Sequence, residues 1–210
     1  MKHLIILLIF LISPGLIKAQ TPKTVKIGNQ VWMSENLGTT IAQDFSGSHF
    51  KNGDPITYVV INEEWEKAAN NKQPAWCYYD NDPANGPKYG KLYNWYAVAA
   101  PQSLCPTGWH VPSDAEWREL EDFLGKEIAG KYLKNSSGWN EGGNGTNQSG
   151  FTALPSGGRL FNGSFFDIGQ SGYWWNSSEA TRGINYADDY INDGFNGDPS
   201  AGYSVRCIKD

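Results

Sequence analysis

The chain has 210 residues, of which 40% are hydrophobic and 19% charged, a composition typical of a soluble globular protein. Its 9 Trp, 11 Tyr and 9 Phe supply many bulky groups for a core and argue against a disordered chain. The net charge is −5, and the 17 basic residues are scattered, which argues against a nucleic-acid partner.

The N-terminus has the pattern of a secretory signal peptide. A basic Lys2 precedes an uninterrupted apolar run over residues 4–12, and Ala19 is a small residue suited to cleavage. The apolar run is about half the ~20 residues that a membrane-spanning helix needs, so no transmembrane segment is expected in the mature chain. We therefore expect a signal peptide over residues 1–19 and one exported domain over residues 20–210, secreted, periplasmic or at the cell surface. An uncleaved anchor is the alternative.

The clearest local signals lie in the first two thirds of the chain. Alternating apolar residues around a Gly-Asn turn predict a hairpin over residues 24–37, and acidic residues after Asn62 predict the start of a short helix. A longer helix is expected after Pro112, because Ser113 and Glu116 have the spacing of a capping box. Gly125 is expected to end this helix, and a weaker helical stretch follows it.

From about residue 136 the sequence is rich in glycine, asparagine and aromatic residues, which favours long loops between short strands. Because the predicted helices precede a strand-rich tail, the fold class is expected to be α+β with an antiparallel sheet. The expected strands cover residues 151–154, 164–168, 173–176, 185–190 and 203–208.

The three cysteines allow one disulfide and one free thiol in an oxidising compartment. Sequence alone permits three pairings among Cys77, Cys105 and Cys207. Cys207 lies in a strand-like apolar alternation near the C-terminus, so pairing it with Cys105 would tie the last strand to the middle of the chain. Cys77 would then be left as a buried free thiol that acts as a small apolar core residue. The alternative, a reactive nucleophile, would need a neighbouring base, and none is near it in the sequence.

An ordered series of motifs runs through nearly all of the mature chain. The motifs are Tyr79-Asp80-Asn81-Asp82, Tyr89-Gly90-Lys91-Leu92-Tyr93-Asn94-Trp95-Tyr96-Ala97, Cys105-Pro106-Thr107-Gly108-Trp109-His110-Val111-Pro112-Ser113, Glu116-Trp117 and Gly202-Tyr203-Ser204-Val205-Arg206-Cys207. This series resembles the Fibrobacter succinogenes major paralogous domain family, known as FISUMP. The resemblance implies an exported or cell-surface bacterial domain without an established activity.

A second resemblance bears on the fold. Residues 111–117 are similar to a stretch of formylglycine-generating-enzyme-like domains, which elaborate the C-type lectin fold. This resemblance implies a C-type lectin-like architecture with two main helices, a small twisted antiparallel sheet and long loops. A disulfide between Cys105 and Cys207 would also be C-type lectin-like. Fold analogy alone does not establish a function.

Aromatic residues of the loop-rich half are the best functional clue. An indole or phenol ring can pack on the C–H face of a sugar while neighbouring polar groups bind its hydroxyls. Adjacent Trp174 and Trp175 point to opposite faces of a strand, so we expect one in the core and the other as an exposed anchor, with burial under a loop as the alternative. The candidate ligand-binding residues are Trp139, Trp174, Trp175, Tyr186 and Tyr190.

Oxygen-rich loops suggest a calcium site as the candidate cofactor, since Ca²⁺ binds carboxylate and amide oxygens. The first candidate comprises Asp80, Asp82 and Asn85; further ones lie in residues 140–147 and 188–193. The alternative for each is a turn whose side chains bind their own backbone. His110 is expected to be a structural histidine.

These features favour an exported recognition module that binds a glycan or a cell-surface protein through the loop-rich half. One alternative is a structural cell-envelope protein without a small ligand. Another is a polysaccharide-acting enzyme on a lectin-like scaffold, although no catalytic residues are assigned and no H-E-x-x-H, G-x-S-x-G or P-loop motif occurs.

Overall fold

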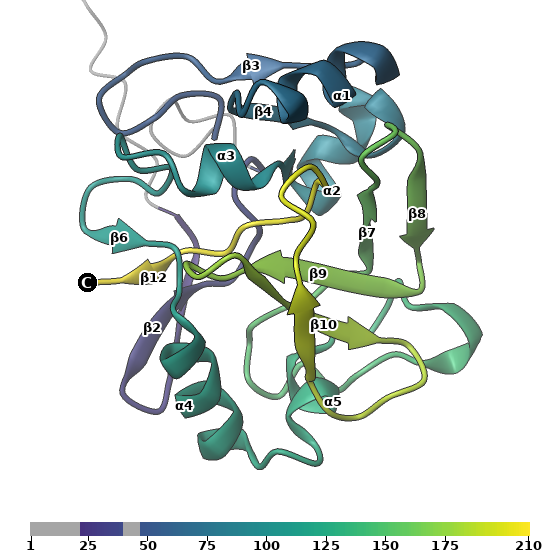
Figure 1. Cartoon of the computed structure of the whole chain (residues 1–210). Coiled ribbons are helices and arrows are strands. Elements are labelled where there is room, and N and C mark those ends of the chain that lie inside the picture. Colours follow the sequence, from purple (N-terminus) through teal and green to yellow (C-terminus); the bar gives the residue numbers. More distant parts are fainter. Residues whose placement is uncertain (1–21, 40–46) are drawn as a thin grey trace, which may run out of the picture.

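The computed structural model describes residues 22–39 and 47–210, so the expected signal peptide over residues 1–19 lies outside the described residues. Helices and short strands mix in an α+β arrangement (Figure 1). No helix within the described ranges is long and apolar enough to cross a membrane. The helices there are α1 (Asn62–Asn70), α2 (Gly86–Tyr89), α3 (Trp95–Val98), α4 (Asp114–Leu124) and α5 (Ala129–Leu133).

The strands are divided among three small sheets. The four-stranded sheet has the order β1 (Thr24–Ile27), β2 (Gln30–Met33), β12 (Ile208–Lys209), β6 (Trp109–His110). The five-stranded sheet has the order β11 (Asn192–Asn196), β10 (Ala180–Asn185), β9 (Ser171–Trp175), β7 (Ser156–Arg159), β8 (Phe165–Ile168). The three-stranded sheet has the order β3 (Thr57–Tyr58), β4 (Ala75–Cys77), β5 (Leu92–Tyr93).

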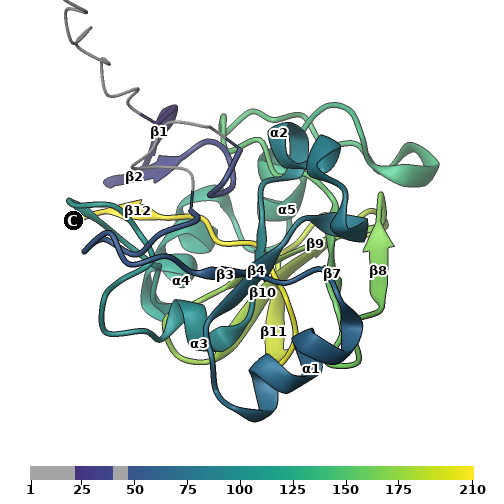
Figure 2. The same cartoon turned by 90° about the horizontal axis from the view of Figure 1, so that it is seen from above.

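This architecture confirms the α+β class and refines the expected single antiparallel sheet. Most pairs are antiparallel, but β3 pairs with β4 and β7 with β9 in parallel. Strands of two to six residues are too short to bury a large surface alone, so each sheet is completed by loops and helices packed against it. Figure 2 shows the same body from above, with β8 at its outer edge.

The two strongest local predictions are confirmed. β1 and β2 form the N-terminal hairpin, paired from Thr24↔Met33 to Ile27↔Gln30. At the start of α4 the Oγ of Ser113 accepts from the Glu116 amide at 3.3 Å, and the Ser113 amide donates to the Glu116 carboxylate at 2.7 Å. This reciprocal cap satisfies amides that the first helical turn leaves free, so the helix begins where the sequence predicts.

Three of the five predicted strands differ from the structure. Over residues 203–208 only isolated bridges at Tyr203 and Ser204 form before β12 begins at Ile208. Of residues 185–190, Asn185 ends β10 and the rest belong to the turn before β11, where the Asn185 side chain accepts from the Ala187 amide at 2.9 Å. That short-range hydrogen bond favours a turn over a strand. Residues 151–154 contribute only an isolated bridge between Lys134 and Ala153, because Phe151 is buried in the core rather than aligned in a ladder.

The C-terminus is tied to the middle of the chain. Cys105 and Cys207 form a disulfide with Cα atoms 6.0 Å apart, and β12 lies between β2 and β6 (Figure 1). Closing a loop over a sequence separation of 102 contributes about 4–5 kcal/mol in the chain-entropy view. Cys77 is free and buried, and burial raises the pKa of its thiol to about 12. The predicted roles of the three cysteines therefore agree with the structure.

Aromatic rings fill the principal core. Trp117 packs against Trp32 with ring centroids 4.9 Å apart and against Phe151 at 5.9 Å, while Trp174 lies 6.2 Å from Phe151. These rings come from β2, α4, β9 and a loop, so they join the four-stranded sheet, the main helix and the five-stranded sheet. Such large, directional contacts hold the five-stranded sheet in a fixed position.

Candidate functional site

The candidate site is one face of β9, β10 and β11. Because side chains alternate along a strand, the pairs Gly183↔Tyr173 and Asn185↔Ser171 share one face of the sheet. Asn192 of β11 is paired with Gly183 and joins the same face. The opposite face turns Trp174 and Ile184 into the aromatic core. The sheet is therefore anchored from behind and open in front.

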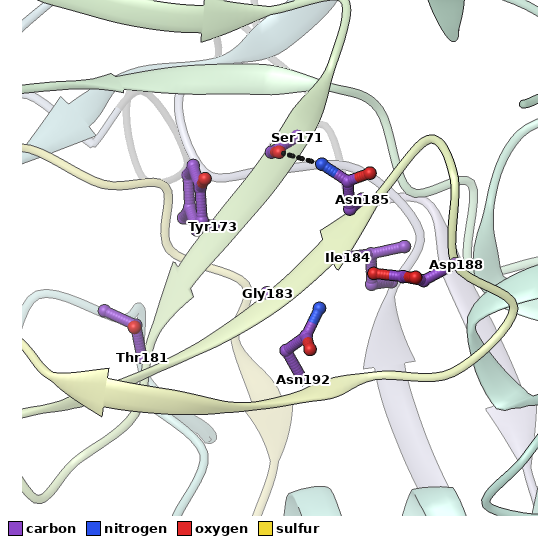
Figure 3. Close-up of a pocket in the computed structure, with 8 residues that line it drawn as sticks. All are labelled: Ser171, Tyr173, Thr181, Gly183, Ile184, Asn185, Asp188 and Asn192. Atoms are coloured by element: carbon purple, nitrogen blue, oxygen red, sulfur yellow. Dashed lines mark hydrogen bonds between the residues drawn. The ribbon is translucent and has the colours of Figure 1, made fainter.

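A cavity of about 220 Å³ lies over this open face. Gly183 has no side chain, which leaves space at the floor of the cavity. A Cβ atom there would lie 3.4 Å from Tyr173 Cδ1 and 3.9 Å from Asn192 Cβ, which are ordinary contact distances. A larger residue could therefore replace the glycine without backbone strain, and its side chain would fill the cavity. Figure 3 shows the lining residues, which are Ser171, Tyr173, Thr181, Gly183, Ile184, Asn185, Asp188 and Asn192.

Tyr173 forms a rigid wall of the cavity. Its ring packs between Phe166 and Tyr203, with centroids 5.7 and 5.5 Å away, and its hydroxyl donates to Asp167 Oδ2 at 2.6 Å. Burial and this hydrogen bond raise the pKa of Tyr173 to about 12, so the phenol stays protonated at neutral pH. The ring offers an aromatic surface, and its hydroxyl is already occupied.

The other polar groups of the cavity are uncharged, apart from one carboxylate. Asn185 Nδ2 donates to Ser171 Oγ at 2.9 Å, which orients both side chains. The half-buried side chains of Asp188 and Asn192 have no hydrogen-bond partner within the described residues. The lining residues include no lysine, arginine or histidine. The cavity can therefore donate hydrogen bonds to a polar molecule and accept them from it, and the one charged group among its described lining residues is the Asp188 carboxylate.

A buried lysine holds the rim of the cavity in place. The ammonium of Lys134 donates to the carbonyl oxygens of Asp188 at 2.7 Å, Tyr186 at 3.2 Å and Asn185 at 3.4 Å. Burial lowers the pKa of Lys134, against the opposing charges of Asp189 and Asp188. Because three carbonyls from residues 185–188 accept from one ammonium, the end of β10 and the following turn keep Asn185 and Asp188 at the cavity.

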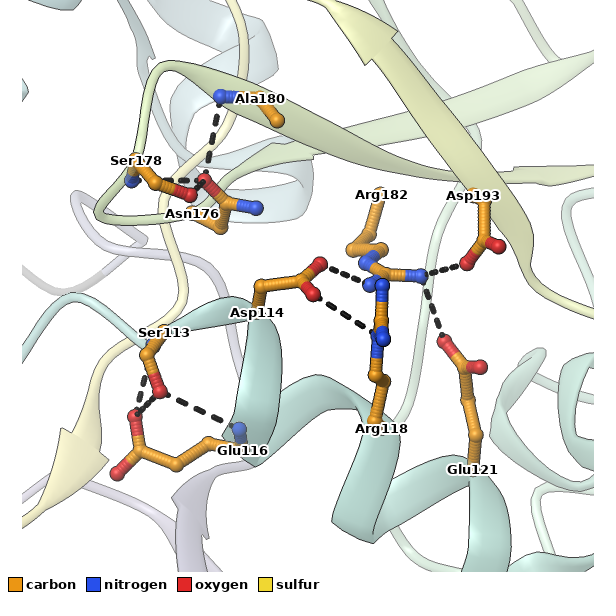
Figure 4. Close-up of polar contacts among 10 residues, drawn as sticks. All are labelled: Ser113, Asp114, Glu116, Arg118, Glu121, Asn176, Ser178, Ala180, Arg182 and Asp193. Carbon is orange, nitrogen blue, oxygen red and sulfur yellow. Dashed lines mark hydrogen bonds and ion pairs between the residues drawn. The ribbon is translucent and has the colours of Figure 1, made fainter.

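Behind the sheet, Arg182 ties β10 and β11 to α4 (Figure 4). Its Nη1 donates to Glu121 Oε1 at 3.1 Å and to Asp193, and its Nη2 donates to Asp114. Asp114 also accepts from Arg118 Nε at 2.9 Å. Burial raises the pKa of Glu121, although the charge of Arg182 opposes that rise. This ion network supports the site from the far side and does not line the cavity.

Asn176 closes the hairpin that joins β9 to β10. Its Oδ1 accepts from the Ser178 amide at 2.9 Å, the Ser178 hydroxyl at 3.0 Å and the Ala180 amide at 3.2 Å (Figure 4). These hydrogen bonds fix the register of β10, so that Thr181 and Arg182 point to opposite faces of the sheet. The hairpin therefore fixes which residues of β10 face the cavity.

Three of the predicted ligand-binding rings are buried. Trp139 is 4% exposed, and Trp174 and Trp175 are both 0% exposed. Trp174 faces the core, as expected for one of the pair, whereas Trp175 is covered by Tyr203 and Trp95, with centroids 5.0 and 5.4 Å away. The expectation of an exposed anchor at one of these two positions is therefore wrong, because burial beneath neighbouring rings occurs instead.

The two predicted tyrosines lie closer to the cavity. Tyr186 and Tyr190 both belong to the turn that also carries Asp188, and Tyr190 is 43% exposed. The charge of Glu141 and a hydrogen bond with it raise the pKa of Tyr186. Their binding role remains a prediction, which their place beside the rim supports.

The predicted calcium ligands lie in a different part of the molecule, between β4 and α2. Asp82 accepts from the Ala84 amide at 2.9 Å, and Asn85 Nδ2 donates to the Tyr79 carbonyl at 3.0 Å. Asp80 is exposed at a φ of 53°. These are local turn contacts, as in the alternative to a metal site. Within residues 22–39 and 47–210 no group of three His, Cys, Asp or Glu is arranged to hold a metal ion. The calcium site thus remains a prediction.

His110 is paired with two carboxylates, as expected for a structural histidine. Its Nδ1 lies 2.7 Å from Asp210 Oδ1 and its Nε2 lies 2.8 Å from Glu116 Oε1. Burial lowers the pKa of His110, but the hydrogen bonds and charges of the two carboxylates outweigh it and raise the pKa overall. The side chain joins the C-terminus to α4 and lies outside the cavity.

Sequence reasoning predicted none of the eight lining residues as ligand-binding, and it included Asp188 and Asn192 only within the candidate calcium loop over residues 188–193. One available signal is the glycine inside the alternation Thr181-Arg182-Gly183-Ile184-Asn185, because a glycine within a strand often marks a place where another group approaches closely. The pairing of β10 with β11 could not be derived from spacing.

The fold and cavity together define a small α+β domain with a polar recess on one sheet. The chain belongs to the family described as the Fibrobacter succinogenes major domain, whose match spans residues 25–209. Neither the comparison with curated proteins nor the comparison with solved structures found a match.

Proposed function

We propose that this chain is an exported recognition module that binds a glycan in the cavity over β9, β10 and β11. The observation that carries the proposal is the lining of the cavity, in which an aromatic wall at Tyr173 faces the Asp188 and Asn192 side chains, which have no hydrogen-bond partner among the described residues. Sugars combine C–H faces that pack on rings with hydroxyls that donate and accept hydrogen bonds. The absence of a base from the lining favours an uncharged glycan.

The volume of the cavity is in keeping with this proposal. About 220 Å³ is a small recess, sufficient for one ring of an oligosaccharide rather than for a long segment. Tyr186 and Tyr190 on the adjoining turn would then contact the units that continue beyond the cavity. This arrangement keeps the recognition role within the loop-rich half of the chain.

Export and the lectin-like fold are parts of the same proposal. The basic start, short apolar run and Ala19 support removal of residues 1–19. A C-terminal strand tied to the middle of the chain through Cys105 and Cys207 supports a C-type lectin-like arrangement. Glycan binding here does not depend on calcium, because Asp80, Asp82 and Asn85 do not line the cavity.

The two alternatives have less support at this site. Glycoside hydrolysis generally uses two carboxyl groups a defined distance apart, and among the described residues that line the cavity Asp188 is the single acid. A purely structural envelope protein would have no need of a recess lined by polar side chains that lack hydrogen-bond partners among the described residues. Both alternatives are tested by the same binding measurement.

The test uses an array of neutral and acidic oligosaccharides, followed by calorimetry with those that bind. Gly183→Val places a branched side chain in the cavity and should weaken binding at least about tenfold. Asp188→Asn removes the carboxylate from the lining, and Asp189→Asn makes the same chemical change just outside it. We expect Asp188→Asn to alter affinity and Asp189→Asn to leave it unchanged. Binding of no glycan, or equal binding by Gly183→Val, would contradict the proposal.

A further inference from the structure

Exposed apolar side chains are concentrated in one region, away from the cavity. Among the described residues, seven large hydrophobic side chains are exposed, and two of them, Phe123 and Tyr190, stand apart in sequence. The other five come from two short segments, residues 58–61 and 160–161. We call these five the apolar surface: Tyr58, Val60, Ile61, Leu160 and Phe161. Clusters of this kind on soluble proteins mark interaction sites more often than isolated apolar residues do.

A buried arginine joins the two segments. Arg159 Nη1 donates to the Val59 carbonyl at 2.8 Å, Nη2 donates to Asn62 Oδ1 at 3.0 Å, and Nε donates to the Gly163 carbonyl at 3.1 Å. The guanidinium also lies 4.5 Å from the centroid of the Trp65 ring. One side chain thus links the segment before α1 to the β7–β8 turn.

The β7–β8 turn and the start of α1 are in direct contact. A Cβ atom on Gly163 would lie 2.5 Å from Asn62 Cγ, which shows how closely the two segments approach. Figure 1 and Figure 2 both place this turn beside α1. The apolar surface is therefore a single region made from two distant parts of the sequence, with little freedom to separate.

The turn over residues 80–82 forms a third side of this region. Asn81 Nδ2 donates to the Val60 carbonyl at 2.7 Å, and the Tyr58 hydroxyl donates to the Asn81 carbonyl at 3.4 Å. The Tyr58 ring also stacks on Trp76 with centroids 4.4 Å apart. These contacts hold the exposed rings and chains in place before any partner arrives, which reduces the entropy lost on binding.

Negative charge surrounds the apolar surface. Three segments make up this region and its surroundings: residues 58–67, 80–82 and 159–164. The one exposed basic residue in them is Lys67, whose ammonium lies 3.7 Å from the Glu64 carboxylate. Five exposed acids occupy the same three segments: Glu63, Glu64, Glu66, Asp80 and Asp82. Two copies placed face to face would bring these acids together, and an anionic lipid surface would also be repelled. A basic partner would be attracted.

We propose that the apolar surface binds a basic protein segment that presents large apolar side chains among lysines or arginines. The apolar side chains of the partner would pack on Ile61 and Phe161, which are 56% and 52% exposed. Its cations would pair with the surrounding acids. This site is separate from the glycan cavity, so the chain would bind two kinds of molecule through different faces.

The test titrates the full folded chain with a synthetic 14-residue peptide of alternating leucine and lysine, observed by NMR. The expected result is binding that perturbs residues 58–67 and 160–164 and weakens as salt is added. A peptide of alternating leucine and glutamate should not bind. The double variant Ile61→Ser, Phe161→Ser should lose at least about tenfold in affinity for the leucine–lysine peptide.

Two matched variants separate specific binding from general attraction to an acidic protein. Phe123→Ser removes a side chain that is 63% exposed outside the apolar surface and should leave affinity unchanged. The double variant Glu63→Lys, Glu64→Lys should have a lower affinity for the leucine–lysine peptide and should bind the leucine–glutamate peptide. The proposal is overturned by equal binding of both peptides to the unaltered chain, by undiminished binding to the double variant, by absence of binding, or by self-association through this surface.

Discussion

Two buried arginines of this protein have opposite surroundings. Arg182, behind the candidate cavity, is matched by three carboxylates. Arg206, near the C-terminus, donates instead to neutral acceptors: Nε and Nη2 bind Asn36 Oδ1 at 3.1 and 2.6 Å, and Nη1 binds the Phe151 carbonyl. Its guanidinium lies 4.2 Å from the centroid of the Phe151 ring.

The difference follows from depth. Arg182 reaches carboxylates that also touch water, since Asp193 and Asp114 have side chains 80% and 39% exposed. Arg206 lies where a carboxylate would itself need to lose its hydration, so amide and carbonyl dipoles take its place. Burial accordingly lowers the pKa of Arg206 to about 9. A buried cation can thus be stabilised by opposite charge at an edge and by dipoles in an interior.

The largest expected effect comes from breaking the dipolar arrangement at Asn36. Its Oδ1 accepts from Arg206 and from Trp174 Nε1 at 2.8 Å, and its Nδ2 donates to the Tyr89 carbonyl at 2.9 Å. Asn36→Ala leaves a buried cation without its main acceptor and should cost about 3–5 kcal/mol of unfolding free energy. Urea denaturation measures this loss. Asn70→Ala, at the exposed end of α1, should cost little.

Removing the cation from the carboxylate-rich region should have a smaller effect. In Arg182→Met, Asp114 and Asp193 can rehydrate, and only Glu121 is left buried, so we expect a loss of about 1–3 kcal/mol. Burial already raises the pKa of Glu121. When the pKa of a carboxyl group is higher in the folded state, the folded protein loses stability as pH rises toward that pKa. The free energy of unfolding of Arg182→Met should therefore be lower at pH 8 than at pH 5.

A second substitution sharpens this prediction. Adding Glu121→Gln to Arg182→Met removes the buried acid and should recover part of the stability at pH 8, with less effect at pH 5. Urea midpoints of the two variants at both pH values provide the comparison. An Arg182→Met variant whose stability loss is the same at both pH values would show that Glu121 does not carry the uncompensated charge.

The smallest expected effect is at His110, a partly exposed cation. Its pKa is raised, so its stabilising contribution is complete below its ordinary pKa of 6.5 and is lost as pH rises through the higher folded value. His110→Asn should remove this dependence and cost at most about 1 kcal/mol at low pH, since exposed ion pairs are weak. Thermal midpoints across this pH window test it. If the pH dependence of stability is unchanged in His110→Asn, another titrating group causes it.

Sequence alone predicts features whose determinants are close together in the chain. The capping box of Ser113 and Glu116 and the hairpin between β1 and β2 depend on residues a few positions apart, and both are found. The hairpin and the cap need little knowledge of long-range packing. The disulfide between Cys105 and Cys207 spans 102 residues, and its choice among three pairings depends on the strand-like alternation around Cys207 and on the C-type lectin-like resemblance.

The candidate site could not be predicted in the same way. Alternation correctly places Trp174 and Trp175 on opposite faces, but only the arrangement of Tyr203 and Trp95 shows that the second face is covered at Trp175. The cavity depends on the registry of Gly183 with Tyr173 and Asn192, which joins three strands. Sequence reasoning therefore pointed to the half of the chain that contains the cavity, but none of its predicted ligand-binding residues lines the cavity.

The position of β12 has a consequence for how the chain reaches its final form. Within the described residues, β12 is the strand that lies between β2 and β6, so the N-terminal hairpin and β6 are joined only when residues 208–209 pair with both of them. The neighbouring Cys207 reaches Cys105 across a sequence separation of 102, so the disulfide and this strand close the same long-range contact. The four-stranded sheet is therefore completed by a long-range folding step, which is slower than the formation of its local hairpin.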